Sequence, residues 1–340
     1  MKLGLMLPYA GPASIWRAGS ETCAMLALEE CAQIGRKTQL FLADCGSTPA
    51  EADAAARYLA YDCGVDIVVG MQLSHQRIAV AKAFQGSVPY IFTPQYEGVD
   101  CGSCVVPIGL KDEEVLRPGI EYFTTRLGIK RWSFVGNDYL WPLQGCRVAT
   151  WHISRVGAKL VHKDFRPFGQ NFETLVSEIE RSKAQAVIVG LLGQESVRFH
   201  RAFAQAGLAK RIYRFCLALD ETLLWALEDW EAENIYACQP FYQGEVASFR
   251  DDLVARHRST FGGSSPPVTS VNVGLYDGVR LALQVANYAR APSRSDIVDF
   301  VRDTLTRPKA LSLLGLADPA TGRQFPRIAA ARDNTFIAHA

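Results

Sequence analysis

The sequence predicts an α/β protein in which parallel sheets are covered by helices and arranged as two similar lobes. The apolar pattern alternates between short strand-like runs and longer helix-like stretches, which is typical of βαβ units. This alternation starts afresh after residue 130. At 340 residues and 49% hydrophobic content, the chain also exceeds the roughly 250–300 residues at which a single core stops growing.

The first series of elements is expected to form one parallel sheet, because strands joined by helical crossovers run in the same direction. We expect strands at residues 2–7, 38–43, 66–70 and 88–92, and helices at 19–34, 50–63, 76–84 and 111–127.

The second series repeats the pattern, and the chain then becomes mainly helical. We expect strands at residues 131–135, 158–163, 186–191 and 211–217, and helices at 142–156, 171–182 and 195–206. The pattern changes after residues 234–240, and three helices are expected at 248–261, 271–290 and 295–305. The tail residues 311–316 and 327–331 are predicted to pair as a β-hairpin. We expect the last helices to return to the first lobe.

Polar and aromatic side chains gather where three predicted strands end. The three clusters are Gly70-Met71-Gln72-Leu73-Ser74-His75, Thr93-Pro94-Gln95-Tyr96-Glu97-Gly98 and Asn137-Asp138-Tyr139-Leu140-Trp141-Pro142. In open α/β sheets, small ligands bind beyond the carboxyl ends of the strands. The clusters therefore predict a protein that holds a small molecule in a cleft.

Charge disfavours nucleic acid as a partner, and hydropathy disfavours insertion into a membrane. The net charge is +1, and Lys and Arg are scattered along the chain, so nucleic acid is not an expected partner. No apolar run approaches the ~20 residues of a membrane span, and the N-terminus shows no signal-peptide pattern. The protein is therefore expected to be cytoplasmic, or else periplasmic if this sequence starts after a removed signal peptide.

The nine cysteines do not predict a disulfide framework or a metal site. Their odd number and their wide spacing favour reduced thiols. Cys101-Gly102-Ser103-Cys104 is a CxxC pair without a second CxxC or a matching His pair, so zinc is disfavoured. We expect a loop pair whose redox state stays open.

Enzymatic motifs are missing from the sequence. There is no GxSxG elbow, no GxGxxG after the first strand and no phosphate-binding loop. His75 follows Ser74 directly, and adjacent helical side chains point about 100° apart, which is unsuitable for a nucleophile–base pair. We therefore expect a non-catalytic protein without a cofactor.

Taken together, the residues resemble those of type I periplasmic-binding-fold proteins. The chain is similar to the branched-chain amino acid, amide and urea binding group, which includes both substrate-binding proteins of ABC transporters and the cytoplasmic amide sensor of an amidase operon. The resemblance runs over nearly the whole length and is most specific in Val69-Gly70-x-x-x-Ser74, Tyr96-Glu97-Gly98, Asp138-Tyr139-x-x-Pro142 and Tyr276-Asp277-Gly278-Val279.

This resemblance implies two Rossmann-like lobes joined by three crossovers that act as a hinge, with the ligand enclosed between the lobes. The N-terminal lobe would comprise residues 1–117 and 245–310, and the C-terminal lobe residues 118–244 and 311–340. The implied ligand-binding residues are Gln72, Ser74, Pro94 and Gln95 in the first lobe, Tyr139, Trp141, Gly193, Gln194, Leu219 and Asp220 in the second, and Tyr242 near the returning crossover. The chain departs from the family pattern at two places, and both bear on which ligand it binds. Gln72 stands where relatives have an aromatic residue, and Thr93-Pro94 replaces the usual order before Tyr96.

Several of these residues have structural interpretations that remain open. Ser74 and Asp220 are suitable N-caps of the helices that follow them. Tyr139 and Trp141 are also compatible with packing in a core.

The candidate residues include no Lys or Arg, which favours a neutral or zwitterionic ligand such as a short amide, a urea-like molecule or an amino acid. Two functions fit such a protein. It is either the solute-binding component that delivers ligand to an ABC permease, or a cytosolic amide-responsive sensor that acts on amidase expression through a regulatory protein. A homodimer is compatible with both functions.

Overall fold

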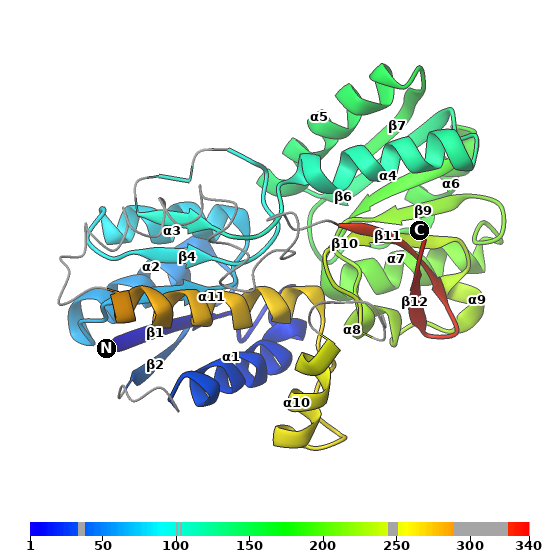
Figure 1. Ribbon diagram of the computed structural model, residues 1–340. Coiled ribbons are helices and arrows are strands. Elements are labelled where there is room, and N and C mark those ends of the chain that lie inside the picture. The colour runs from blue at the N-terminus through cyan, green and yellow to red at the C-terminus, as the bar shows by residue number, and fades with distance from the viewer. Residues whose placement is uncertain (33–37, 100, 103, 244–250, 289–325, 340) are drawn as a thin grey trace. The chain divides into compact units, whose positions relative to one another are not determined.

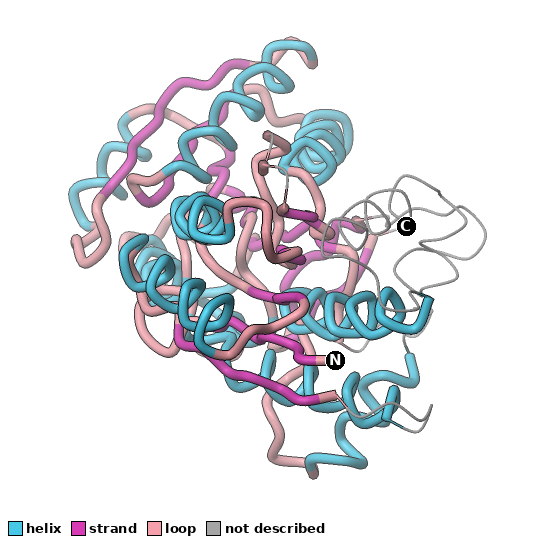
Figure 2. Tube along the Cα trace, turned by 90° about the vertical axis from the view of Figure 1, so that its left-hand side faces the viewer, coloured by secondary structure: helices cyan, strands magenta, loops and turns pink. Residues whose placement is uncertain are grey.

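The computed structural model describes residues 1–32, 38–99, 101–102, 104–243, 251–288 and 326–339 (Figure 1). The chain divides into two compact units, each assembled from two separate stretches. The first unit is Met1–Leu110 with Phe249–Phe325, and the second is Lys111–Ser248 with Pro326–Ala340. Helices flank the strands in both units (Figure 2), which confirms the predicted α/β class.

The first unit contains a five-stranded parallel sheet in the order β2-β1-β3-β4-β5. Its strands are β1 (Lys2–Leu7), β2 (Gln39–Asp44), β3 (Ile67–Gly70), β4 (Tyr90–Phe92) and β5 (Val105–Pro107). Its helical segments are η1 (Ser14–Trp16), α1 (Arg17–Ala32), α2 (Pro49–Arg57), η2 (Tyr58–Asp62), α3 (Ser74–Phe84), α10 (Asp251–Phe261) and α11 (Ser270–Tyr288).

Local chemistry accounts for the start of α2. Thr48 Oγ1 accepts a hydrogen bond from the Glu51 amide at 3.3 Å, and Glu51 Oε2 accepts one from the Thr48 amide at 2.8 Å. This reciprocal pair is a capping box, and Pro49 occupies the first helical position. The helix then widens into the π-helical turn η2, which the sequence pattern did not distinguish from the rest of the predicted helix.

Helix α11 packs closely on the first sheet because of a glycine. A Cβ added at Gly278 would lie 2.8 Å from Val69 Cγ1 and 2.8 Å from Thr93 Cγ2, which is too close for any side chain. Helix α11 also lies beside α1. Gly278 in the Tyr276-Asp277-Gly278 motif therefore lets α11 pack directly on the ends of β3 and β4.

The second unit contains a seven-stranded sheet in the order β12-β11-β10-β9-β8-β6-β7. Strands β6 (Arg131–Asn137), β7 (Lys159–Arg166), β8 (Ala186–Gly190), β9 (Tyr213–Cys216) and β10 (Ile235–Gln239) run parallel. Its helices are α4 (Asp112–Arg126), α5 (Leu140–Arg155), α6 (Glu173–Arg181), α7 (Gly193–Gln205), α8 (Glu221–Leu224) and α9 (Asp229–Ala232).

The C-terminal hairpin differs from the prediction. Strand β11 (Arg327–Arg332) pairs antiparallel with both β10 and β12 (Thr335–Ala338). Asp333 and Asn334 form its turn with φ values of 48° and 56°, a conformation that Asp and Asn tolerate well. Because both edges of β11 are occupied, the expected pairing of residues 327–331 with 311–316 is wrong. Residues 311–316 themselves, and the helix expected at 295–305, lie outside the described residues.

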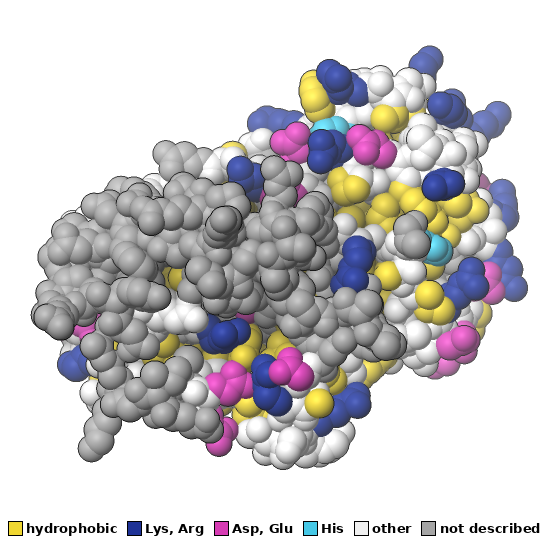
Figure 3. Space-filling view, viewed as in Figure 1, with side chains coloured by type: hydrophobic (Ala, Val, Ile, Leu, Met, Phe, Trp, Pro, Cys, Tyr) yellow, Lys and Arg dark blue, Asp and Glu magenta, His cyan; other side chains and the backbone are white. Residues whose placement is uncertain are grey.

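Charged side chains are mixed on the surface. On the face shown in Figure 3, Lys and Arg are scattered among Asp and Glu over the described residues and do not gather in one stripe. Across the described part of the chain, no helix is long and apolar enough to cross a membrane.

Candidate functional site

Gln72 lies in the core of the first unit, just beyond the carboxyl end of β3. Its side chain is 3% exposed, and its Nε2 donates a 2.9 Å hydrogen bond to the Met6 carbonyl oxygen. Its Oε1 accepts a hydrogen bond from the Tyr90 hydroxyl. Both ends of this amide therefore hold the strands of the first sheet together.

Ser74 is the first residue of α3, and the N-cap position belongs to Leu73. The capping role considered for Ser74 is therefore wrong. Gln76 performs it instead: its Oε1 accepts from the Leu73 amide at 3.1 Å, and its Nε2 donates to the Cys45 carbonyl oxygen at 3.1 Å. Ser74 is 4% exposed, and among the described residues its hydroxyl has no hydrogen-bond partner.

Pro94 and Gln95 are half-buried at the end of β4. A Cβ added at Gly109 would collide with the Pro94 carbonyl group, and the Tyr96 amide donates to the Leu110 carbonyl oxygen at 3.0 Å. The loop that carries Pro94 and Gln95 is therefore held against residues 109–110 by the backbone itself.

Glu97 in the same loop forms a buried ion pair. Arg77 Nη1 lies 3.0 Å from Glu97 Oε2, and both side chains are at most 1% exposed. The Arg77 guanidinium also lies over the rings of Phe92, at 5.1 Å, and Tyr96, at 6.0 Å. The Tyr96-Glu97-Gly98 motif thus anchors its loop to α3.

Tyr139 and Trp141 occupy different environments at the start of α5. Tyr139 is the N-cap residue and is half-buried, with its ring 5.8 Å from the exposed ring of Phe168. Trp141 is buried, and its Nε1 donates a 2.8 Å hydrogen bond to Asp112 Oδ1. The two ring centroids are 6.4 Å apart. Of the pair, Tyr139 is the one that presents ring surface.

Gly193 and Gln194 open α7, directly after β8. Gly193 has a φ of +52°, a region that glycine enters without steric cost. It is buried, whereas Gln194 is exposed. The preceding Leu192 amide donates to Asn137 Oδ1 at 3.0 Å, which ties this turn to the end of β6.

Leu219 and Asp220 lie between β9 and α8. The buried Leu219 carbonyl oxygen accepts a hydrogen bond from Gln239 Nε2 at 2.7 Å. Asp220 is 1% exposed and caps α8, since its Oδ1 accepts from the amides of Thr222, at 3.1 Å, and Leu223, at 3.4 Å. The capping interpretation of Asp220 is confirmed.

Glu221 is a buried acid that the sequence analysis did not select. Its Oε1 accepts from the Gln243 amide at 2.7 Å, and its Oε2 has no partner among the described residues. Burial, reinforced by the neighbouring Asp220 carboxylate, raises the pKa of Glu221 to about 8. The carboxyl is therefore mainly protonated at neutral pH and can donate a hydrogen bond.

Asn137 and Gln239 complete a set of incompletely paired polar groups. Asn137 Nδ2 and Gln239 Oε1 are buried and without partners in the described part of the chain. These residues end β6 and β10, and Glu221 follows β9. Because the three strands are parallel, all three groups lie at the carboxyl edge of the second sheet. In the sequence, Asn137 and Glu221 follow the predicted strands 131–135 and 211–217 within four residues, whereas Gln239 lies inside residues 234–240, so position pointed to the first two alone.

Tyr242 is fixed by the C-terminal hairpin. It is 1% exposed, its hydroxyl donates a 2.9 Å hydrogen bond to the Arg327 carbonyl oxygen, and its ring lies 5.1 Å from that of Phe336. These contacts join the end of β10 to β11 and β12.

None of the cysteine side chains that the structure describes is joined in a disulfide, and this includes those of Cys101 and Cys104. Cys101 Sγ donates to the Val99 carbonyl oxygen at 3.4 Å, and Cys104 Sγ donates to that of Ala81 at 3.6 Å. Within the described ranges, no group of three or more His, Cys, Asp or Glu side chains is arranged to hold a metal ion.

Solved structures of similar fold are binding proteins. A solute-binding protein of an ABC transporter from Rhodopseudomonas palustris BisB5, solved in complex with 3,4-dihydroxybenzoic acid, is 18% identical with a TM-score of 0.83, covering 100% of this chain and 96% of its own. A leucine-binding protein from Thermotoga maritima MSB8 is 17% identical with a TM-score of 0.84, at coverages of 100% and 98%. A branched-chain amino acid binding protein from Streptococcus pneumoniae, solved with isoleucine, is 15% identical with a TM-score of 0.80, at coverages of 100% and 99%.

The sequence profile of the family described as periplasmic binding protein matches residues 1–323. This range includes both sheets up to β10 and the strand-end residues described above. The match agrees with the expectation of a non-catalytic protein that binds small molecules. The chain belongs to the periplasmic binding protein family.

Proposed function

We propose that this protein is the solute-binding component of an ABC-type uptake system and that its solute is a short amide, a urea-like molecule or an amino acid. The observation that carries the proposal is the set of buried polar groups at the carboxyl edge of the second sheet. Buried polar groups are nearly always hydrogen-bonded. Asn137 Nδ2, Glu221 Oε2 and Gln239 Oε1 have no protein partner among the described residues, and a bound solute would supply one.

The chemistry of these groups favours a neutral ligand. Asn137 Nδ2 is a donor, Gln239 Oε1 is an acceptor, and protonated Glu221 is able to donate. A primary amide or a urea offers a carbonyl acceptor and N–H donors within a few atoms, which matches this set. None of the three groups carries a positive charge, so a phosphate or a dicarboxylate would be poorly compensated.

From the first unit, we propose Ser74, Pro94 and Gln95 as further ligand contacts. Ser74 is the first residue of α3, where the helix also presents backbone N–H groups. From the second unit, Tyr139 is the candidate that would stack on the ligand. Gln72 and Tyr242 are assigned a supporting role, because their polar atoms are engaged in their own units.

A thermal-shift screen with amides, ureas and amino acids tests the proposal. A ligand present at 100 times its dissociation constant stabilises the folded protein by about 2.7 kcal/mol, which is readily detected. The best ligand is then titrated by calorimetry into wild type and Asn137→Ala. We expect weaker binding by Asn137→Ala. If no compound in the panel shifts the melting temperature, the small-solute proposal fails.

Glu221 provides a second test that separates the ligand classes. An ammonium group beside Glu221 would stabilise the carboxylate, so binding at pH 7 would release protons. A neutral amide would leave the carboxyl protonated and would release none. Calorimetry of one ligand in two buffers of different ionisation enthalpy measures this release directly.

The alternative function is a cytosolic amide-responsive sensor that acts on a regulatory protein. It is favoured by the buried free thiols, such as Cys23, Cys45 and Cys216, because unpaired cysteines are typical of proteins from reducing compartments. Co-purification of the tagged protein with a membrane permease supports uptake, whereas ligand-dependent co-purification with a soluble regulator supports sensing.

A further inference from the structure

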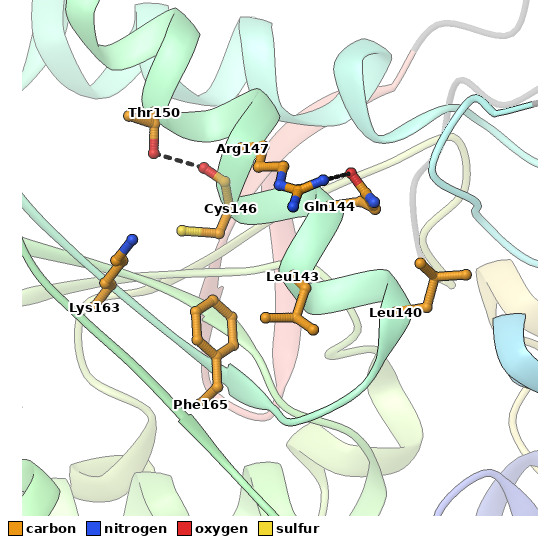
Figure 4. A pocket seen from close by; sticks show the side chains of 8 residues that line it. All are labelled: Leu140, Leu143, Gln144, Cys146, Arg147, Thr150, Lys163 and Phe165. Atoms are coloured by element: carbon orange, nitrogen blue, oxygen red, sulfur yellow. Dashed lines mark hydrogen bonds between the residues drawn. The ribbon is translucent and has the colours of Figure 1, made fainter.

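A groove of about 280 Å³ lies between α5 and β7 in the second unit (Figure 4). Strand β7 is the edge strand of its sheet, so no further strand among the described residues covers this side. The groove is lined by Leu140, Leu143, Gln144, Cys146, Arg147, Thr150, Lys163 and Phe165. None of these residues belongs to the candidate solute site.

Two cations in this groove have no acidic partner. Among the described residues, neither Lys163 nor Arg147 lies within ion-pair distance of a carboxylate. Burial raises the pKa of the Cys146 thiol, so the thiol is neutral at pH 7 and does not compensate Lys163. In Figure 4, Lys163 extends from β7 beside the Cys146 thiol, and the Arg147 guanidinium lies against Gln144 on α5.

The polar atoms that face the groove are mainly donors. Gln144 Oε1 accepts a 3.2 Å hydrogen bond from Arg147 Nη1, and the Cys146 carbonyl oxygen accepts a 2.7 Å hydrogen bond from the Thr150 hydroxyl. These two acceptors are therefore already engaged within α5. Lys163 and Arg147 are exposed, so the ammonium and the remaining guanidinium N–H groups can bind an acceptor from solution, and charge-assisted hydrogen bonds to an anion are the strongest that they can form.

The floor of the groove is apolar. Phe165 packs on Phe134, with ring centroids 5.8 Å apart, and Leu140 and Leu143 lie on the helix side. An occupant therefore needs an apolar body as well as an anionic end.

We propose that this groove binds a small carboxylate with a compact apolar body, with the carboxylate held by Lys163 and Arg147 and the body against Phe165, Leu140 and Leu143. Its volume is close to the lower end of the ~300–1,000 Å³ range of small-molecule sites. A protein partner would need about 800 Å² of surface on each side, whereas Leu143 is the one exposed large apolar side chain in the lining. The site is independent of the proposed solute site, because none of the proposed solute-binding residues lines it.

The experiment uses the whole chain labelled at leucine methyl groups and titrated with cyclohexanecarboxylate, followed by NMR. Signals of Leu140 and Leu143, assigned by Leu→Ile substitutions, report on this groove, and the charge variant below separates binding here from entry of the probe into the solute site. The test variant is Lys163→Gln with Arg147→Gln. The matched control is Lys159→Gln with Arg155→Gln, which removes the same charge from β7 and α5 at exposed positions outside the groove.

We expect saturable shifts of both methyl signals in wild type and in the control. Affinity should fall about tenfold or more in the test variant, since two charge-assisted contacts are lost. The neutral analogue cyclohexanecarboxamide should bind about tenfold more weakly than the carboxylate to wild type. Absence of shifts in wild type, equal affinity in the test variant, or equal affinity for the amide overturns the proposal.

Discussion

The indole Nε1 of Trp141 donates a 2.8 Å hydrogen bond to Oδ1 of Asp112, and this contact joins the first turn of α5 to the first turn of α4. Both side chains are at most 5% exposed. Tyr139, two residues earlier, is half-buried. Trp141 therefore contributes to the contact between α4 and α5, whereas Tyr139, in the same motif, stays partly exposed.

Replacement of Trp141 by Phe should lower the free energy of unfolding by about 1–3 kcal/mol, because it removes a donor from the buried Asp112 carboxylate. Truncation to Ala should cost roughly 3–5 kcal/mol. Urea unfolding followed by circular dichroism measures both. Tyr139→Ala is the comparison, and we expect it to weaken solute binding with less effect on stability. Unchanged stability of Trp141→Phe would show that the hydrogen bond does not hold the two helices.

Because Arg77 and Glu97 form a buried ion pair, we expect a single variant to lose more stability than a double variant. Glu97→Gln leaves the Arg77 guanidinium buried without its counter-charge, and we expect a loss of about 3–5 kcal/mol. Replacing both residues by Met should cost much less, because two buried charges are removed together. Denaturant unfolding of the wild type, the single and the double variant completes the comparison. A double variant as unstable as the single one would contradict this interpretation.

Glu221 predicts a pH dependence of stability. Its pKa is raised from 4.5 to about 8 in the folded protein, so between these values the folded state retains a proton that the unfolded state loses. The stability contribution of this group is therefore greatest below about pH 4.5, falls by up to about 1.4 kcal/mol per pH unit above it, and becomes constant above about pH 8. Glu221→Gln should remove this component. Urea unfolding at pH 5, 6 and 7 tests whether the variant has a flatter profile than wild type.

Variants of Asp220 should separate its role as the N-cap of α8 from a role in ligand binding. Asn is as good an N-cap as Asp, so Asp220→Asn should preserve stability, while Asp220→Ala should lose about 0.5–2 kcal/mol. Calorimetric titration of Asp220→Asn then reports on ligand contact alone. If an ammonium ligand faces Asp220, its affinity should fall by the ~1.5–3 kcal/mol of a charge-assisted hydrogen bond. Equal affinity for every ligand would leave Asp220 with the cap as its role.

Much of the fold could be predicted because buried parallel strands and amphipathic helices have different apolar periods. The short strand β5 was missed, since Val105-Val106-Pro107 directly follows the CxxC loop and lacks the longer run, Val88 to Phe92, that marked β4. The hairpin partner of β11 was also misjudged. Its turn is made by Asp333-Asn334, a short signal next to the chain end, whereas 318–322 offered a more obvious turn composition.

The strand ends that carry polar residues could be predicted from position, but the role of each side chain could not. Gln72, Glu97 and Glu221 all follow buried strands, and all look equally polar in the sequence. Tyr90 and Met6 engage Gln72, and Arg77 engages Glu97, whereas Glu221 keeps an oxygen without a partner among the described residues. These partners come from distant elements, so only the packed structure distinguishes support from recognition.

The antiparallel pairing of β10 with β11 has a consequence for synthesis of the chain. Arg327 follows Gln239 by roughly 90 positions, and ribosomes add about 5–20 residues per second. For several seconds, the edge of β10 that β11 later covers is without its partner while strands β6 to β10 are already complete. An unpaired strand edge is a site of mispairing with other chains. The edge of β10 is therefore protected from such mispairing only after the C-terminal hairpin has been synthesised. We expect a chain truncated before Arg327 to accumulate as insoluble protein.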